Sequence, residues 1–260
     1  CEAEKASVLL STKEAGGSRV AALTLRQTGI SLAAERYPVA LADGAKLVLE
    51  DCLIEGGAGH GVAVINGGSA SLRDVRVLKC GWDGLAVNGD GSVADAVDCR
   101  FDSNFHHGID AWGGGRVTVK SSRATKNGLA GVVIMSRGVR SELVQCTIDR
   151  NREVGVSISN GTIAVLRSNR VEENLLGGVM IEGEGTTAGM EGNVTERNSK
   201  FGIMADRRST IEPFRENETK ENIGEQLMLR AVMPEEVVQP PPMLDVSGGK
   251  FLERGPEIPK

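Results

Sequence analysis

The hydrophobic and polar positions of this chain repeat with a period of 23 or 24 residues. The repeating unit is a glycine followed by an apolar, a variable and an apolar residue, as in Gly61-Val62-Ala63-Val64. In a strand, this alternation places the two apolar side chains on one face and the variable side chain on the other. We therefore expect one short strand, with an inward and an outward face, after each of Gly61, Gly84, Gly108, Gly131, Gly155, Gly178 and Gly202.

The same register is expected to continue beyond these glycines at both ends. Counting 23 residues back from Gly61 leads to the segment Pro38-Val39-Ala40-Leu41, in which Val39 and Leu41 take the inward positions. Counting 22 residues forward from Gly202 leads to Gly224. Residues 20–32 are expected to add one coil at the N-terminal end.

Asparagine forms a second column, four residues before the glycine, and supports the period independently. Stacked asparagines hydrogen-bond one another and the turn backbone from coil to coil, and they tolerate left-handed turn geometry. We interpret the column as a structural ladder. Its members are Asn104, Asn127, Asn151, Asn174 and Asn198.

Each period contains two further short strands, one with inward pairs such as Leu47 and Leu49, and one that contains residues such as Ile54 and Phe101. A unit that recurs at this length indicates a solenoid. The expected fold is all-β, a single-stranded right-handed parallel β-helix of about nine coils. We expect it over residues 20–229, after an N-terminal cap at 1–19 and before a Pro-containing C-terminal tail at 230–260.

Composition and charge narrow the range of partners. A net charge of −5, from 30 basic and 35 acidic residues, argues against nucleic acid. No stretch is apolar for long enough to span a membrane.

Cys52, Cys99 and Cys146 recur in one column on alternate coils, too far apart for disulfides, so we expect buried thiols. Cys1 matches the first residue of a mature bacterial lipoprotein and favours an extracellular or cell-surface location, although a chain boundary at that position explains it equally well.

The glycine and apolar triplet, with asparagine four residues upstream, resembles the repeat of the right-handed parallel β-helix family, the pectate-lyase-like superfamily. The resemblance covers about residues 20–229. It implies the fold and a family of polysaccharide lyases, glycoside hydrolases, uronan epimerases, phage tailspikes and non-catalytic repeat proteins. Because these members share the coil, the resemblance does not predict one reaction.

The outward face of the repeated strand carries the candidate chemistry. All three histidines and both tryptophans of the chain fall on this face within three neighbouring coils. Imidazoles supply a base near neutral pH, carboxylates supply an acid or a metal ligand, and indoles stack on sugar rings. We predict His107, His106, Asp83 and Asp110 as catalytic residues, and Trp82, Trp112, Asn88 and His60 as substrate-binding residues.

Three mechanisms compete for these side chains. In a lyase or an epimerase, His107 or His106 removes the proton next to a uronate carboxylate, which Asn88 or a basic residue helps to neutralise. In an inverting hydrolase, Asp83 and Asp110 act as the acid and the base. A metal site converges most easily on Asp83, His107 and Asp110, although we expect neither a metal nor another cofactor.

Beyond this site the outward face becomes apolar, and a patch of that length is seldom left exposed. Either residues 230–260 fold back over it, or a protein partner or a second protomer covers it. The leading hypothesis is a carbohydrate-binding or polysaccharide-modifying protein whose partner is a polysaccharide or an oligosaccharide, and whether it is an enzyme stays open. The alternative is a non-catalytic scaffold for protein–protein interaction through the apolar residues Val133, Met135, Val154, Leu176, Met180, Phe201 and Met204.

Overall fold

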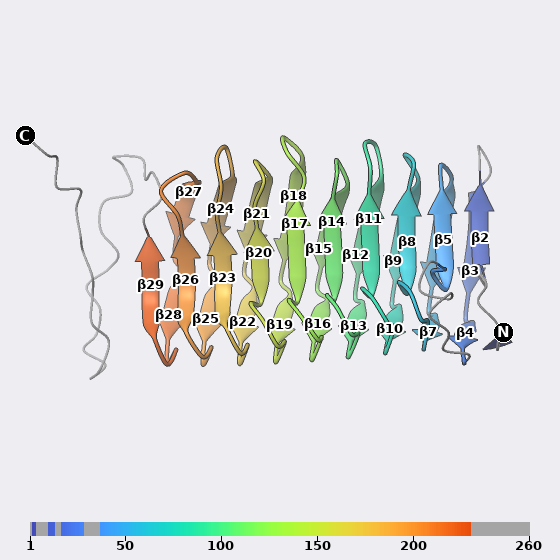
Figure 1. Cartoon of the computed structure of the whole chain (residues 1–260), viewed down its shortest axis with the longest axis horizontal. Helices are drawn as coiled ribbons and strands as arrows, with labels where there is room; N and C mark the ends of the chain where they lie inside the picture. Colours follow the sequence, from blue (N-terminus) through green and yellow to red (C-terminus); the bar gives the residue numbers. More distant parts are fainter. Residues whose placement is uncertain (1, 4–9, 14–16, 29–36, 230–260) are drawn as a thin grey trace, which may run out of the picture.

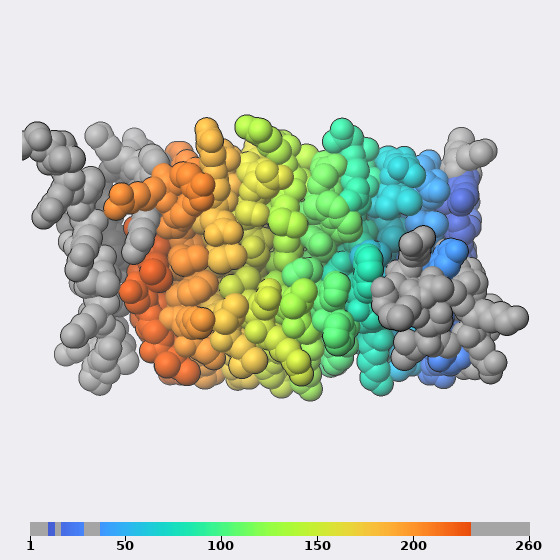
Figure 2. All heavy atoms as spheres, in the orientation of Figure 1, coloured from blue at the N-terminus to red at the C-terminus, as the bar shows by residue number. Residues whose placement is uncertain are grey.

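The computed structural model describes residues 2–3, 10–13, 17–28 and 37–229. Every regular element among them is a β-strand, and the strands stack in parallel into three sheets. The sheets run along the long axis of the molecule and give it the form of an elongated solenoid (Figure 1). Successive coils form parallel ridges across its surface (Figure 2).

The chain visits the three sheets in the same order in every coil. Sheet B contains β2 (Leu10–Lys13), β5 (Ala40–Asp43), β8 (Val62–Ile65), β11 (Leu85–Asn88), β14 (Ile109–Trp112), β17 (Val132–Met135), β20 (Val156–Ile158), β23 (Gly177–Ile181), β26 (Phe201–Ala205) and β29 (Glu225–Leu229). Sheet C contains β3 (Gly17–Ala21), β6 (Lys46–Glu50), β9 (Ser69–Arg73), β12 (Val93–Val97), β15 (Arg116–Lys120), β18 (Arg140–Val144), β21 (Ile163–Arg167), β24 (Thr187–Glu191) and β27 (Thr210–Arg215). Sheet A contains β1 (Glu2–Ala3), β4 (Thr24–Gln27), β7 (Leu53–Glu55), β10 (Arg76–Leu78), β13 (Arg100–Asp102), β16 (Arg123–Thr125), β19 (Thr147–Asp149), β22 (Arg170–Glu172), β25 (Val194–Glu196) and β28 (Glu218–Lys220).

Sheet C has nine strands in the described part of the chain, which is close to the predicted number of coils, and the strand arrangement confirms the predicted all-β solenoid. Strands β1, β2 and the start of β3 fall in the segment predicted as an N-terminal cap, and each stands at one end of its sheet. The boundaries of the three predicted segments stay predictions, and Cys1 and residues 230–260 lie outside the described residues. Within the described part, no helix has the length and apolar character that crossing a membrane requires.

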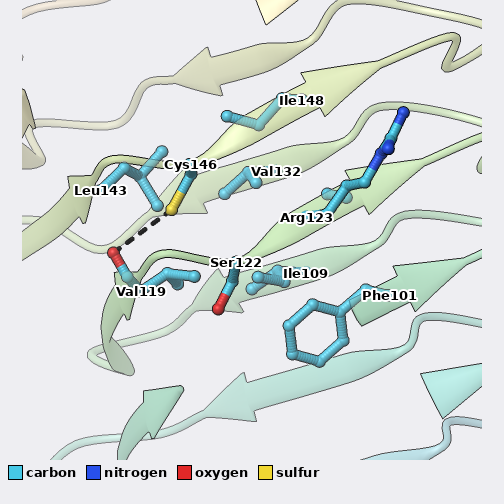
Figure 3. A pocket seen from close by; sticks show the side chains of 10 residues that line it. Phe101, Ile109, Val119, Ser122, Arg123, Val132, Leu143, Cys146 and Ile148 are labelled. Carbon is cyan, nitrogen blue, oxygen red and sulfur yellow. Dashed lines mark hydrogen bonds between the residues drawn. The ribbon is translucent and has the colours of Figure 1, made fainter. Parts of the chain in front are cut away.

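The inward side chains of the three sheets form one hydrophobic core along the axis. Leu47, Leu49, Ile54 and Phe101 are fully buried in it, as the alternation predicted. The void lined by the side chains in Figure 3, among them Phe101, has a volume of about 10 Å³. That volume is at the lower limit for a single water molecule, so the coils are closely packed.

The predicted cysteine column consists of buried free thiols. Cys52, Cys99 and Cys146 are free and buried. Cys80 is also free and buried, but it lies at the turn between sheets A and B, where its backbone N–H donates to Asn104. Cys146 Sγ donates to the carbonyl of Val119 at 3.5 Å (Figure 3). Burial raises the pKa of Cys80 to about 12 and that of Cys146 to about 11, so both thiols stay neutral and packed.

The asparagine column forms a buried ladder, as predicted, and has six members rather than five. Asn127 donates through its backbone N–H and its Nδ2 to Asn151 Oδ1, at 3.0 and 2.9 Å. Its Nδ2 also donates to the Phe101 carbonyl at 3.2 Å. The sixth member is Asn222, and the ladder ends where Gln226 Oε1 accepts from the Asn222 side chain at 2.9 Å.

A second, shorter ladder at the turn between sheets C and A was not predicted. Asn169 donates to Asn193 Oδ1 at 2.9 Å, and Asn193 donates to Asn217 Oδ1 at 2.8 Å. The signal was present in the sequence, because these asparagines recur at 24-residue spacing. Two of the turns in a coil are therefore held by side-chain ladders over this part of the chain.

The predicted register is wrong at the N-terminal end of the repeat. Ala40 pairs with Val62, so the spacing there is 22 residues instead of 23. Ala40 and Ala42 form the inward pair of β5, whereas the prediction placed Val39 and Leu41 there. A slip of one residue exchanges the two faces of a strand, because side chains alternate along it.

The predicted register is also wrong at the C-terminal end. Ile203 pairs with Leu227, so Gly202 aligns with Gln226 and not with Gly224. The spacing is 24 residues, as in neighbouring coils, and no glycine occupies the aligned position. The side chain at that position, Gln226, accepts the last hydrogen bond of the asparagine ladder.

The ladder is expected to contribute strongly to stability. Replacing Asn151 with alanine leaves the N–H and the Nδ2 of Asn127 without their acceptor in a buried turn. We expect the free energy of unfolding, measured by urea titration, to fall by about 2–4 kcal/mol. The matched control is Arg152→Ala at the adjacent exposed position, which should change it by less than about 0.5 kcal/mol. Equal losses in the two variants would show that the ladder is not a stabilising element.

Candidate functional site

The predicted site lies on the outer face of sheet B, across β8, β11 and β14 and the turns that precede them. Parallel pairing places Asp110 beside Ala86 and Val133, and Trp112 beside Asn88. Equivalent residues on adjacent strands lie about 4.8 Å apart. The register alone therefore brings together side chains that are a whole coil apart in the sequence.

Asp83 is the buried anchor of the site, with 3% of its surface exposed. Its Oδ1 accepts a hydrogen bond from the backbone N–H of His107 at 2.9 Å. Its Oδ2 lies 3.1 Å from His60 Nδ1, although the two atoms are not aligned for a hydrogen bond. Burial opposes ionisation, but the interactions with His60 and His107 outweigh it and hold the pKa of Asp83 below its ordinary value. Asp83 is therefore an anion at neutral pH.

One ring nitrogen of His107 is engaged in a hydrogen bond with the backbone. Its Nδ1 accepts a hydrogen bond from the backbone N–H of Ala130, one coil further on, at 3.1 Å. Burial lowers the pKa of His107, although the carboxylates of Asp83 and Glu153 oppose the shift. The ring is therefore neutral near pH 7, and because Nδ1 is an acceptor, the single ring proton lies on Nε2.

Asp110 has a buried carboxyl oxygen, Oδ1, without a hydrogen-bond partner among the described groups. Burial, with a further contribution from Asp83, raises the pKa of Asp110 to about 7. Both the protonated and the ionised form of Asp110 are therefore populated near neutral pH.

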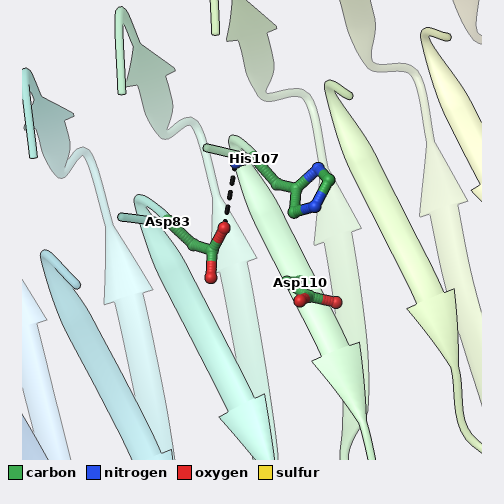
Figure 4. Close-up of side chains that lie close together, drawn as sticks. All are labelled: Asp83, His107 and Asp110. Carbon is green, nitrogen blue, oxygen red and sulfur yellow. Dashed lines mark hydrogen bonds between the residues drawn. The ribbon is translucent and has the colours of Figure 1, made fainter. Parts of the chain in front are cut away.

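Asp83, His107 and Asp110 converge, as the sequence analysis anticipated for a metal site (Figure 4). One ligand-type atom of each residue lies within 4.8 Å of the other two, a spacing that a cation could bridge. However, a ring nitrogen that carries a proton cannot coordinate a metal, and the bond from Ala130 keeps the proton on Nε2. With only two carboxylates left as ligands, the geometry favours proton chemistry over metal binding.

Aromatic rings form a continuous row beside this cluster. Trp82 stacks on His106, with ring centroids 5.8 Å apart and planes inclined by 11°. His60 meets Trp82 edge-on at 5.0 Å and contacts Trp112 at 6.3 Å. Trp112 stands at the end of β14 and reaches back to a histidine two coils away, so the row connects three coils.

The row ends at Phe105, which the sequence analysis did not single out. The Phe105 ring centroid lies 5.9 Å from that of His106, and 73% of the residue is exposed. The signal was its position directly after Asn104, at a turn where both neighbouring coils carry glycine. Of the predicted residues, Asn88 lies at the margin, and the other seven form the cluster and its row of rings. Their catalytic and binding roles stay predictions.

The outward face beyond the site is apolar, as predicted, and packs as a cluster of its own. Its buried members are no more than 5% exposed, and half-buried side chains surround them, so the cluster largely covers itself. Phe201 lies over Gly177, where a Cβ would approach its ring to 2.3 Å. Met204, the last residue of the predicted stripe, is not among its members, which are Ala130, Val133, Met135, Val154, Leu176, Met180 and Phe201.

Comparison with known proteins identifies the fold. Residues 60–223 match the family described as "Right handed beta helix region". No curated protein matches the sequence of this chain. The family match confirms the right-handed parallel β-helix that the repeat predicted.

Two solved structures are similar to this chain. The first is pectate lyase Pel9A, with 15% identity and a TM-score of 0.51 over 77% of this chain. The chain spans only 57% of the length of that lyase. The second is the A-module of the Azotobacter vinelandii mannuronan C-5 epimerase AlgE4, with 11% identity and a TM-score of 0.51 over 86% of this chain and 80% of that one. At these identities the likeness concerns the fold.

The two carboxyl groups of the site are expected to affect stability in opposite ways. Because the pKa of Asp110 is raised to about 7 in the folded state, its contribution to the free energy of unfolding is fully present below about pH 4 and is lost as pH rises to about 7. Asp110→Asn removes the cost of ionising this group. We expect it to increase the free energy of unfolding at pH 8 by about 1–3 kcal/mol, and the gain should vanish toward pH 4.

Asp83→Asn is the matched control for this measurement. The pKa of Asp83 is lowered, so its contribution is present above the unfolded-state pKa and is lost as pH falls through the folded-state value. Urea unfolding at pH 8 should therefore show a loss of about 1–3 kcal/mol for this variant. Destabilisation of both variants at pH 8 would contradict the described environment of Asp110.

Proposed function

The chain belongs to the right-handed β-helix family, and we propose that it binds and chemically modifies a polysaccharide on the outer face of sheet B. Both similar structures are named as enzymes of polysaccharides, pectate in one and mannuronan in the other. A face of stacked strands, with aromatic rings beside titratable groups, suits a ligand that is itself an extended chain.

The observation that carries this proposal is the state of Asp110. A general acid or base works best when its pKa lies near the working pH, and that of Asp110 is raised to about 7. Its buried Oδ1 has no hydrogen-bond partner in the described part of the molecule, and the Asp110 side chain as a whole is only half-buried on the outer face of sheet B. A purely structural carboxylate in a polar ladder would be paired, as Asp83 is.

The geometry favours a different base from the sequence-based hypothesis, in which His107 or His106 removed the proton. Nδ1 of His107 is occupied by the Ala130 N–H, and Nε2 carries the proton. His107 is therefore a hydrogen-bond donor toward the site. Asp110 is the group that exchanges a proton, and Asp83 positions His107 through its backbone N–H.

Proton removal next to a uronate carboxylate fits this arrangement. The C–H bond breaks, the proton passes to a carboxylate oxygen of Asp110, and the electron pair is delocalised into the substrate carboxyl group. The Nε2–H of His107 donates to the oxygen on which negative charge develops. In a lyase, the bond to the neighbouring glycosidic oxygen then breaks, a C=C bond forms, and the expelled oxygen takes a proton from water. In an epimerase, a water molecule on the opposite face returns a proton to the same carbon, and Asp110 later releases its proton to solvent.

Inverting hydrolysis fits less well. In that mechanism the two carboxyl groups stand about 6.5–9.5 Å apart to admit a water molecule. The nearest oxygens of Asp83 and Asp110 lie within 4.8 Å of each other. Asp83 is also buried and engaged by His60 and His107.

A non-catalytic scaffold is the second candidate, and the apolar cluster beyond the site favours it. Its seven members adjoin the site through Ala130 and Val133 on the same face. A scaffold of this kind would bind a protein or a second copy of the chain through the apolar cluster. It would bind no polysaccharide.

Incubation with pectate and with mannuronan tests the proposal. Unsaturated uronate detected by ultraviolet absorbance would report a lyase, and inversion at C-5 detected by NMR would report an epimerase. We expect Asp110→Asn to reduce kcat by at least about 100-fold while binding of the polymer is retained. The rate of the wild type should rise as pH increases through about 7, because the base is the ionised form of Asp110.

The matched control is Ser157→Ala, in the same outward column two coils away from Asp110. It should leave the rate and the affinity unchanged. Full activity of Asp110→Asn would overturn the assignment of the base. A wild type that modifies and binds neither polymer but associates with itself would favour the scaffold.

A further inference from the structure

Phe105 is an exposed aromatic ring at an edge of the site. It directly follows the ladder residue Asn104, and 73% of its surface is accessible. Among the described residues, most large apolar side chains are buried in the core or belong to the apolar cluster. The position of Phe105 therefore leaves an apolar ring in water next to polar groups that are themselves largely covered.

The neighbouring coils leave the Phe105 ring open along the axis. The backbone N–H of Phe105 donates to Cys80 and that of Gly128 donates to Asn104, so Gly81 and Gly128 occupy the aligned positions. Neither glycine can be replaced easily, because a Cβ would lie 2.1 Å from the Ala58 carbonyl at Gly81 and 1.9 Å from the Phe105 carbonyl at Gly128. Thus neither aligned residue contributes a side chain that covers the ring.

The ring is also continuous with the site. Phe105 contacts His106 at 5.9 Å, and His106 stacks on Trp82 at 5.8 Å. Phe105 precedes Asp110 by five residues on the same coil, which limits their separation to about 16–18 Å. A ring within that range, at the edge of the row, is in reach of a sugar unit next to the one held over Asp110.

We propose that Phe105 forms an outer sugar-binding subsite, on which the apolar face of a pyranose ring stacks next to the unit that is modified. This inference rests on the proposed function and deepens it by locating where the rest of the polysaccharide lies. The ligand chain enters or leaves the site at the turn between sheets A and B. Phe105 holds this chain and takes no part in the proton transfer.

Affinity for oligosaccharides of graded length tests the subsite. The probes are oligosaccharides of pectate and of mannuronan from two to eight units, titrated calorimetrically into the full chain. We expect Phe105→Ala to weaken binding of the longer probes about 3- to 10-fold, and to leave the affinity for the disaccharide unchanged. Phe105→Trp should restore or increase the affinity.

Leu175→Ala is the matched control. Leu175 follows the ladder residue Asn174 at the equivalent turn three coils away, is 56% exposed, and has no described ring contact. Its removal should change neither affinity nor rate, and both variants should keep the melting temperature of the wild type.

The outcomes separate this inference from the proposed function. Modification of the polymer with wild-type affinity in Phe105→Ala would overturn the subsite and leave the proposed function standing. Length-dependent binding that requires Phe105, without any modification of the polymer, would support the subsite and overturn the catalytic proposal. If the wild type bound no probe, both would be overturned.

Discussion

The constant spacing of hydrogen-bonded parallel strands sets the position of every coil and of every outward side chain in this solenoid. Adjacent strands can pair only at about 4.8 Å, so each coil repeats the position of the last and each outward residue stands above its equivalent. The buried asparagine ladder enforces the same spacing at the turn, because each side chain accepts from the residue one coil before it. Chemistry on this fold is therefore arranged in columns, and a site arises where neighbouring columns carry complementary groups.

The turn that precedes sheet B supplies the backbone hydrogen-bond donors that fix Asp83 and the His107 ring. The backbone N–H of His107 donates to Asp83, and the backbone N–H of Ala130 donates to the His107 ring. Both donors are backbone groups at the turn, where the strand ladder is only beginning. The fold thus determines which nitrogen of the imidazole carries a proton and leaves Asp110 as the group able to exchange one.

The errors of the sequence-based register occur where the repeat loses its glycine. At Gln226 the glycine pattern led to an alignment two residues off, although Asn222 stands four residues before it, as the ladder requires. The asparagine column was the better guide because its side chains are bonded from coil to coil. The glycine is required only where a neighbouring backbone or ladder amide comes too close, as at Gly131, where a Cβ would lie 2.7 Å from both Asn151 Nδ2 and the Gly155 carbonyl.

The period, the three-sheet parallel solenoid, the ladder and the outward face with the histidines and tryptophans could all be predicted from the sequence, because they follow from residue spacing. The interactions of those side chains became clear only from the folded arrangement of the coils. Trp112 reaches back to His60, Phe105 stands between two glycines, and Asp110 has a buried oxygen without a described partner. Side-chain direction, burial and protonation depend on what the adjacent coils place around each group, and spacing along one chain does not contain that information.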